Sequence, residues 1–296
     1  MKLTKTIVAI LSSLIFWATS SAQIFYVGDN GNNSVAKVTA SGNVSFFANT
    51  NAPVDVTSNV SGDVFVVNDQ PYDTISEITP SGNSSIYASL SSQPKTAAFD
   101  DSGNLFVSTT DGISEITPEG NVSSFVSGSS FGSGAFGLAF NSTGTLFVTG
   151  NGDTVYEVTT SGNVSTFATV PGFTAINGIS IDADGNVYVA DYYADEVEKI
   201  TPGGNVTTFA TGFNEPGFLA FDNDGNLYVT NIATSGPNSN TISEVTPEGN
   251  VSTFATGFHQ PEGITFVPEP WQWGLISGLI VSVMTLCRNR TFRLKN

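Results

Sequence analysis

The feature that most constrains the fold is an internal repeat of about 41 residues. One copy runs from Phe218 to Ala255 and reads FLAFDNDGNLYVTN, then a variable loop, then NTISEVTPEGNVSTFA. The residue that follows the first glycine turn falls at positions 63, 104, 145, 186 and 226, in steps of 41, 41, 41 and 40. A repeat of this period predicts one supersecondary unit per copy, with each unit packed against its neighbours.

Each copy contains four short stretches of β-prone residues. In the copy quoted they are FLAFD, NLYVTN, TISEVT and NVSTFA, in which Val, Ile, Phe, Tyr and Thr are frequent, as half-buried strands require. Glycine turns separate the first stretch from the second and the third from the fourth, which suits tight antiparallel connections. Four strands in about 41 residues are typical of a propeller blade.

The two ends of the repeat region indicate how the blades close into a ring. The last copy stops after its first strand, Gly263–Val267, and the strand that should follow it lies at the other end of the chain, in residues 24–29. Pairing the two removes an exposed sheet edge. We therefore expect an all-β fold: a six-bladed β-propeller of residues 23–267, with four-stranded blades and a ring closed by the N-terminal strand.

A family resemblance agrees with this fold. The segment GISIDADGNVYVADYYADEVEKITPGGNV (Gly178–Val206) resembles NHL-type repeats and the related senescence-marker and gluconolactonase propellers. The resemblance extends over nearly all of residues 23–267. It implies the propeller fold but selects no function, because this fold carries hydrolases, lyases and pure binding modules.

The N-terminus has the features of a secretory signal peptide. Lys2 and Lys5 precede an uncharged, mostly apolar stretch over residues 7–18, and Ser20-Ser21-Ala22 supplies the small residues that a signal peptidase recognises. We expect residues 1–22 to be removed on export, with an uncleaved membrane anchor as the alternative.

The C-terminus carries a second sorting feature over residues 268–296. Pro268-Glu269-Pro270 precedes an apolar run over residues 271–287, which is at the short end for a membrane-spanning helix, and four basic residues follow. This order resembles the PEP-CTERM sorting signal of Gram-negative bacteria, in which an exosortase removes the helix. The resemblance implies an exosortase-type partner, transient anchoring in the inner membrane, and a final location at the cell-envelope surface or outside the cell. An ordinary single-pass anchor is the alternative.

Charge and cysteine content exclude several classes of function. Residues 23–267 contain 25 acidic residues and only three basic ones, Lys37, Lys95 and Lys199. Such a surface repels phosphate backbones, so we expect no nucleic-acid partner. The only cysteine, Cys287, lies in the C-terminal tail, so the body has neither a disulfide nor cysteine chemistry.

The variable loops are expected on one face of the ring, opposite the regular glycine turns, and binding residues favour such loops. The position at the end of each second strand reads Asp29, Asn68, Thr109, Gly150, Asp191 and Asn231. Carboxylates and amides there suit a hard cation or sugar hydroxyls, so Asn68 and Asn231 are candidate ligand-binding residues. Asp and Asn also end strands for purely structural reasons, which is the alternative interpretation.

A metal site is implied by the family resemblance. Gluconolactonase-like propellers hold a divalent metal with Glu, Asn and Asp side chains near the starts of their inner strands. The matching position here reads Val54, Lys95, Phe136, Asn177, Gly217 and Glu262. Asn177 and Glu262, with Asp191 and Asp29, are thus candidate ligands for a divalent cation such as calcium, although Lys95 in the same ring would oppose one.

The remaining candidates lie in the variable loops. Tyr72, Tyr192, Tyr193 and Phe131 could stack on sugar rings or partner side chains, or pack on neighbouring loops. His259 is the only histidine and could act as a general base beside Glu262, as in streptogramin-lyase-like propellers, or be an ordinary loop residue.

Two functions remain open from the sequence. The first is a non-catalytic module that binds a glycan or a protein of the bacterial envelope or extracellular matrix. The alternative is a metal-dependent hydrolase similar to gluconolactonase or lactonase, with its site in the central channel. A purely structural surface-layer component is a third interpretation.

Overall fold

The computed structural model describes residues 23–131, 134–150, 152–170 and 176–268, and the side chains of Ile176, Asn177 and Pro268 are outside this description. The expected signal peptide and the apolar segment 271–287 also lie outside the described residues. Within the part of the chain that is described, no helix is long and apolar enough to cross a membrane.

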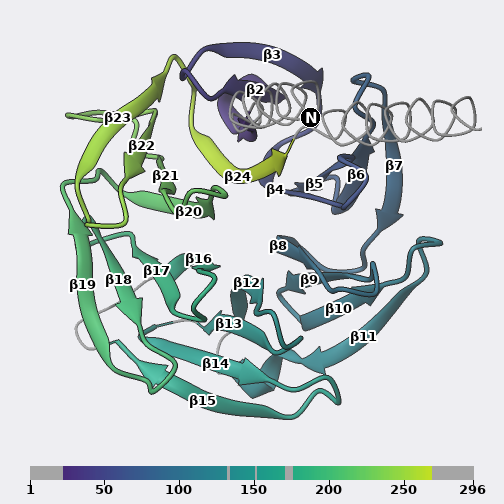
Figure 1. The fold of residues 1–296 in the computed structure, drawn as a ribbon. Helices are drawn as coiled ribbons and strands as arrows, with labels where there is room; N and C mark the ends of the chain where they lie inside the picture. The colour runs from purple at the N-terminus through teal and green to yellow at the C-terminus, as the bar shows by residue number, and fades with distance from the viewer. Residues whose placement is uncertain (1–22, 132–133, 151, 171–175, 269–296) are drawn as a thin grey trace, which may run out of the picture. The chain divides into compact units, whose positions relative to one another are not determined.

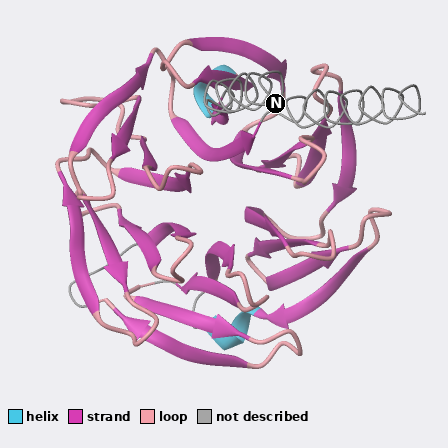
Figure 2. Cartoon of the chain, viewed as in Figure 1, coloured by secondary structure: helices cyan, strands magenta, loops and turns pink. Residues whose placement is uncertain are grey.

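The described strands form six four-stranded antiparallel sheets around a centre, as Figures 1 and 2 show. Blade 1 comprises β24 (Pro261–Pro268), β1 (Gln23–Asp29), β2 (Ser34–Thr39) and β3 (Val44–Asn49). Blade 2 comprises β4 (Pro53–Ser58), β5 (Val64–Asn68), β6 (Thr74–Ile78) and β7 (Ser84–Ser89). Blade 3 comprises β8 (Pro94–Phe99), β9 (Leu105–Thr109), β10 (Gly112–Ile116) and β11 (Val122–Ser127).

The other three blades follow the same order. Blade 4 comprises β12 (Ala135–Phe140), β13 (Leu146–Gly150), β14 (Thr154–Val158) and β15 (Val164–Thr169). Blade 5 comprises β16 (Ile176–Ile181), β17 (Val187–Asp191), β18 (Glu196–Ile200) and β19 (Val206–Thr211). Blade 6 comprises β20 (Pro216–Phe221), β21 (Leu227–Asn231), β22 (Thr241–Val245) and β23 (Val251–Thr256). The described residues also include two short 3₁₀ helices in loops, η1 (Asn30–Asn32) and η2 (Gly128–Phe131).

The ring closes as the sequence predicts. Blade 1 has the strand order β24-β1-β2-β3, so the first and last described strands pair within one sheet. The apolar cluster at this seam joins Phe25 and Val27 of β1 to Tyr228 and Ile242 of blade 6. Because every strand of the ring lies within residues 23–268, and residues 24–267 form one compact unit, this segment contains what the ring needs to fold by itself.

Six apolar clusters hold neighbouring blades together. Aromatic rings on the second strands pack against other aromatic rings, both on the same blade and on the next blade. Several of these pairs have an edge-to-face geometry. For example, the Phe65 ring centroid lies 5.0 Å from that of Tyr87 on its own blade and 4.9 Å from that of Phe99 on blade 3. Edge-to-face pairs of this kind stabilise beyond the area they bury.

The regular glycine turns lie on one side of the ring, called here the turn face, and the variable loops on the other, called the loop face. In the turn after β16, Asp182 Oδ1 accepts hydrogen bonds from the backbone N–H groups of Asp184 and Asn186, at 3.0 and 2.8 Å. Gly185 in this turn has φ of 81°, a conformation that favours glycine. The repeated Asp-x-Asp-Gly-Asn sequence is therefore a structural turn.

The inner strands β4, β8, β12, β16, β20 and β24 approach one another closely around the centre. Their third residues are Asp55, Thr96, Gly137, Gly178, Phe218 and Gly263. A Cβ atom at Gly263 would overlap the backbone of Asp55, and one at Gly178 would lie 2.5 Å from the Gly217 carbonyl oxygen. Glycine at these two positions thus permits the contact between adjacent inner strands.

Candidate functional site

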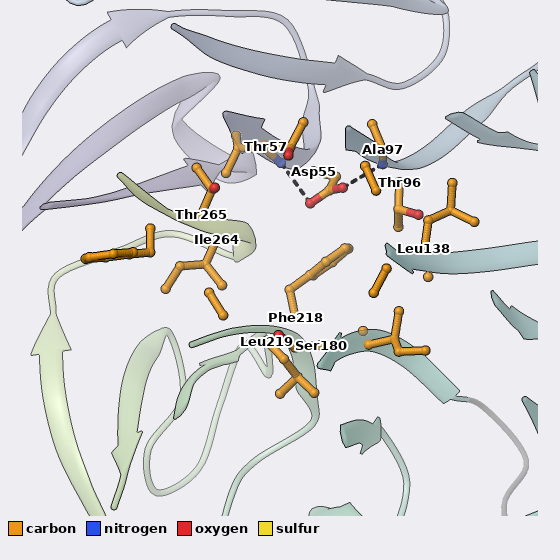
Figure 3. A pocket seen from close by; sticks show the side chains of 18 of the residues that line it. Asp55, Thr57, Thr96, Ala97, Leu138, Ser180, Phe218, Leu219, Ile264 and Thr265 are labelled. Carbon is orange, nitrogen blue, oxygen red and sulfur yellow. Dashed lines mark hydrogen bonds between the residues drawn. The ribbon is translucent and has the colours of Figure 1, made fainter. Parts of the chain in front are cut away.

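The inner strands line a central cavity of about 390 Å³. It extends over the third to sixth residues of the inner strands, so it occupies the half of the channel nearer the turn face. Most of its lining residues are aliphatic or aromatic, but more than half of its exposed surface is polar, with hydroxyl groups from Thr57, Ser180 and Thr265 among the polar atoms. Figure 3 shows Phe218 pointing into the middle of this cavity, opposite Asp55.

Asp55 is the one carboxylate in the wall of this cavity. Its Oδ1 accepts a hydrogen bond from the Val56 N–H at 2.8 Å, and its Oδ2 accepts one from the Ala97 N–H at 2.9 Å (Figure 3), so that it joins β4 to β8. Burial raises the pKa of Asp55 to about 8, with a smaller contribution from the nearby Glu262 carboxylate. At neutral pH this group is therefore largely a neutral acid.

A second cavity, of about 180 Å³, lies at the mouth of the channel on the loop face. We call it the channel-mouth cavity. Five polar side chains line it, Asp69, Gln93, Lys95, Thr96 and Glu262, together with the rings of Phe136 and Phe218. Phe218 and Thr96 border both cavities, so they separate the mouth from the central cavity.

Glu262 projects into the channel-mouth cavity from β24. Among the described residues, no hydrogen bond or ion pair holds its carboxylate. Burial raises the pKa of Glu262 to about 7, and the Asp69 carboxylate adds to the shift. A carboxyl group that is half protonated near neutral pH can either donate or accept a hydrogen bond to a ligand.

The other polar groups of this cavity are arranged by short contacts. Gln93 Nε2 donates to Asp69 Oδ1 at 2.7 Å. The Lys95 ammonium lies 4.3 Å from the centre of the Phe136 ring and, among the described residues, within salt-bridge distance of no carboxylate. The cavity thus combines a cation, an amide, two carboxyl groups and aromatic surface.

The candidate residues at the ends of the second strands point into the fold. Asn68 and Asn231 are completely buried. Asn68 Oδ1 accepts a hydrogen bond from Thr50 Oγ1 at 2.6 Å, and its Nδ2 donates to the Thr74 and Ser76 hydroxyls. Asn231 makes the same kind of contacts, with its Oδ1 accepting from the backbone N–H of Asn214. These bonds tie the variable loops to the strands.

Asp29 and Asp191 occupy the same position in blades 1 and 5. Asp29 is buried, and its two oxygens accept hydrogen bonds from the His259 backbone N–H at 2.8 Å and from Asn32 Nδ2 at 2.7 Å. Asp191 Oδ1 accepts from the backbone N–H groups of Tyr193 and Ala194, and burial raises the pKa of Asp191. Both carboxylates are thus engaged in ordering loops.

The predicted metal set is not brought together among the described side chains. No group of three or more His, Cys, Asp or Glu residues in the described part of the chain is arranged to hold a metal ion. Asn177 lies in β16, but its side chain is outside the description, so its role stays a prediction.

The loop aromatics divide into buried and exposed rings. Tyr193 and Tyr72 are exposed over 70% and 49% of their surfaces, which leaves them free to contact a ligand. Tyr192 packs on Tyr193 with ring centroids 4.9 Å apart, and burial and the adjacent Glu215 raise its pKa to about 12. For Phe131 the alternative of packing within the protein holds, because this ring is completely buried against Tyr156.

His259 lies in the exposed part of the loop before β24. Its contacts are made by the backbone: its N–H donates to Asp29 Oδ1, and its carbonyl accepts from the Gly31 N–H at 2.7 Å. These two bonds fix the loop to β1 and η1. No hydrogen bond of the imidazole to another described residue orients it as a base.

Sequence reasoning missed Asp55, Asp69 and Gln93. A signal for Asp55 did exist, because it is the one carboxylate at the third position of the six inner strands. Asp69 and Gln93 gave no such signal, since they lie in variable loops and meet only when blades 2 and 3 pack together.

Comparison with known proteins supports the fold alone. No family model matches the chain, and no curated protein matches its sequence. Among solved structures, virginiamycin B lyase from Staphylococcus aureus is 17% identical, with a TM-score of 0.62 over 83% of this chain and 85% of that one. A chain of a nidogen/laminin complex is 15% identical, with a TM-score of 0.69 over 82% and 98%.

A third similar structure is the calcium-binding protein regucalcin from Agrobacterium tumefaciens, 16% identical, with a TM-score of 0.60 over 72% of this chain and 77% of that one. These neighbours include a lyase, a complex component and a calcium-binding protein. At such identities the shared feature is the propeller, and the function has to be argued from the residues of this chain.

Proposed function

We propose that the protein is a non-catalytic binding module that holds a glycan at its channel-mouth cavity on the loop face. The observation that carries the proposal is the lining of that cavity: an ammonium, an amide and two carboxyl groups beside the Phe136 and Phe218 rings. Sugar residues present many hydroxyl groups, each both a donor and an acceptor, around apolar C–H faces. A mixed polar lining next to aromatic carbons is suited to such a ligand.

The loops around the cavity extend the proposed surface. The Tyr192 hydroxyl lies close enough to the Glu215 and Glu262 carboxylates for both to raise its pKa. The neighbouring Tyr193 presents an exposed ring on the same loop. A ligand longer than one sugar residue could therefore contact the cavity and this ring together, and aromatic side chains supply such contact at little cost in conformational entropy.

The strong excess of acidic residues favours a neutral or cationic glycan over a polyanionic one. With its sorting features, the protein would meet such a ligand at the cell-envelope surface or in the extracellular matrix. Export, exosortase processing and the final location remain part of this proposal.

The proposal is tested by applying labelled protein of residues 23–268 to an array of neutral and amino-sugar-containing bacterial polysaccharide fragments. Binding of a defined glycan class is expected, and Lys95→Ala and Gln93→Ala should each weaken it about tenfold, the effect of losing one or two hydrogen bonds. Lys37→Ala is the matched control, because it removes the same charge from blade 1, outside the cavity. If the protein bound no glycan but bound an envelope protein, the glycan proposal would be wrong and the ligand would be a protein.

A metal-dependent hydrolase is the second candidate. Glu262 favours it, since its carboxylate faces a cavity and has a pKa of about 7, and the similar regucalcin is described as calcium-binding. This function would need Asn177 and further ligands beside Glu262. Calorimetric titration with calcium, and assays on lactones and esters with wild-type and Glu262→Gln protein, distinguish the two candidates.

A further inference from the structure

A groove of about 520 Å³ lies on the turn face between blades 2 and 3, on the opposite side of the ring from the channel mouth. We call it the blade 2–3 groove. Phe65, Tyr87 and Phe99 form its aromatic wall, and Val60 and Pro118 form part of its apolar edge. Its charged lining residues are three carboxylates, Glu77, Asp100 and Asp101, without any basic residue.

The aromatic wall of this groove has a close counterpart elsewhere in the ring. In blade 5, Tyr188 occupies the repeat position of Phe65, with Phe209 and Phe221 at the positions of Tyr87 and Phe99. The Tyr188 centroid lies 5.0 Å from each of the other two, with interplanar angles of 80° and 74°. The Phe65 pairs have distances of 5.0 and 4.9 Å and angles of 84° and 77°. The two aromatic frames are therefore nearly the same.

The two frames differ in the charge placed over them. In blade 5, Lys199 occupies the repeat position of Glu77. Its ammonium lies 5.1 Å from the Tyr188 ring centre and 3.8 Å from Asp182 Oδ2. Blade 5 thus shows an ammonium group held between an aromatic face and the carboxylate of Asp182, whose repeat position in blade 2 is Asn59.

The blade 2–3 groove lacks such an internal cation among the residues that line it. Within the described part of the chain, the carboxylates of Glu77 and Asp101 make no hydrogen bond or ion pair, and the negative charges of Glu77 and Glu119 add to the effect of burial in raising the pKa of Tyr87. In blade 6 the corresponding Glu244 accepts a hydrogen bond from the Tyr228 hydroxyl at 3.1 Å. Phe65, which replaces that tyrosine in blade 2, has no hydroxyl to offer Glu77.

We propose that the blade 2–3 groove binds a basic side chain of a partner protein, with the cationic group held by Glu77 and Asp101 beside the partly exposed rings of Tyr87 and Phe99. Lys199 in blade 5 is the internal example of the bound group. The groove is larger than one ammonium requires, and Val60, exposed at the groove's edge, offers contact to an apolar residue beside the basic one. The partner segment therefore has a lysine or arginine next to an apolar residue.

Backbone amide NMR of residues 23–268 tests the proposal, with the peptide acetyl-Lys-Leu-Lys-amide as the probe. Shifts are expected at Val60, Phe65 and Tyr87, and they should decrease as salt is added. Glu77→Gln and Asp101→Asn should each weaken binding about fivefold, the loss expected for one partly exposed charge contact. Glu77→Lys places a cation over Phe65 from within the chain and should abolish binding.

Glu157 provides the matched control, because it occupies the repeat position of Glu77 in blade 4. Glu157→Gln and Glu157→Lys make the same charge changes and should leave peptide binding unchanged. Melting curves of all variants establish that the ring is folded. Equal losses with Glu157 and Glu77 variants would show non-specific charge attraction and overturn the site, as would peptide-induced shifts confined to the loop face.

Discussion

Asp55→Asn is the substitution whose effect depends most on the structure described. The Asp55 carboxyl group accepts two backbone hydrogen bonds, from Val56 and Ala97, in a buried site between β4 and β8. Asparagine has a single acceptor oxygen, so its NH₂ group would face one of the two N–H donors. An unsatisfied buried N–H costs about 1–3 kcal/mol. At pH 5 we therefore expect the variant to be less stable by about this amount.

The sign of the pH dependence follows from the raised pKa. Folded Asp55 has a pKa of about 8 against an ordinary value of 3.8, so between these values the folded protein binds more protons than the unfolded chain. Its stabilising contribution is complete below the unfolded pKa and is lost as pH rises through the folded pKa. By linkage the free energy of unfolding falls by about 3–4 kcal/mol between pH 5 and pH 8 from this group.

The asparagine side chain of the variant does not titrate, so the cost of the substitution should shrink with rising pH and approach zero or reverse sign near pH 8. Urea unfolding of wild-type and Asp55→Asn protein at pH 5, 6, 7 and 8 measures this difference. Asp184→Asn, at an exposed turn position, is the control and should show a nearly constant difference. A difference for Asp55→Asn that stays constant from pH 5 to pH 8 would refute the raised pKa, and a stabilised variant at pH 5 would refute the hydrogen-bonding argument.

Three further predictions concern the ring and its loops. Gly263→Ala should lower the free energy of unfolding by several kcal/mol, because the new Cβ would overlap the backbone of Asp55; thermal unfolding measures this loss. Gly257→Ala is the control: its Cβ lies in open space, so the substitution should cost about 1 kcal/mol through the positive φ alone. Removing residues 23–29 deletes β1 from blade 1 and should abolish the cooperative unfolding transition, whereas deletion of residues 1–22 should leave it intact. Asn68→Ala should cost about 2–3 kcal/mol in urea unfolding, because the hydroxyls of Thr50, Thr74 and Ser76 lose their shared partner; an effect below about 0.5 kcal/mol would show that Asn68 does not fix the loops.

The fold could be predicted in detail because the same strand and turn pattern occurs in every copy of the repeat. The turn glycines and the β-prone stretches recur at a spacing of about 41 residues, so a copy with an unclear pattern can be interpreted from the others. The closure of the ring followed from one missing strand after Gly263–Val267 and one extra strand at residues 24–29. The pairing of β24 with β1 confirms that prediction.

The candidate site could be predicted only in part. Asn68 and Asp29 have the residue types of a ligand site, but sequence alone does not tell a side chain that points into the channel from one that holds a loop. Asp55 occupies the third position of its inner strand, where three other blades have glycine. That it is buried next to Gly263 becomes visible only when the inner strands pack together. Gln93 and Asp69 lie 24 positions apart and meet through the packing of two blades.

The proposed glycan site is tested most directly by locating the strongest ligand from the polysaccharide array on the protein itself. Amide and side-chain NMR of residues 23–268, titrated with that glycan, reports which residues it contacts. We predict shifts at Gln93, Lys95 and Glu262, with intermolecular contacts from the Phe136 ring to the sugar protons, and their loss in Gln93→Ala. Shifts confined to the turn face, or a binding glycan whose signals leave these residues unchanged, would contradict the assignment of the channel-mouth cavity as the binding site.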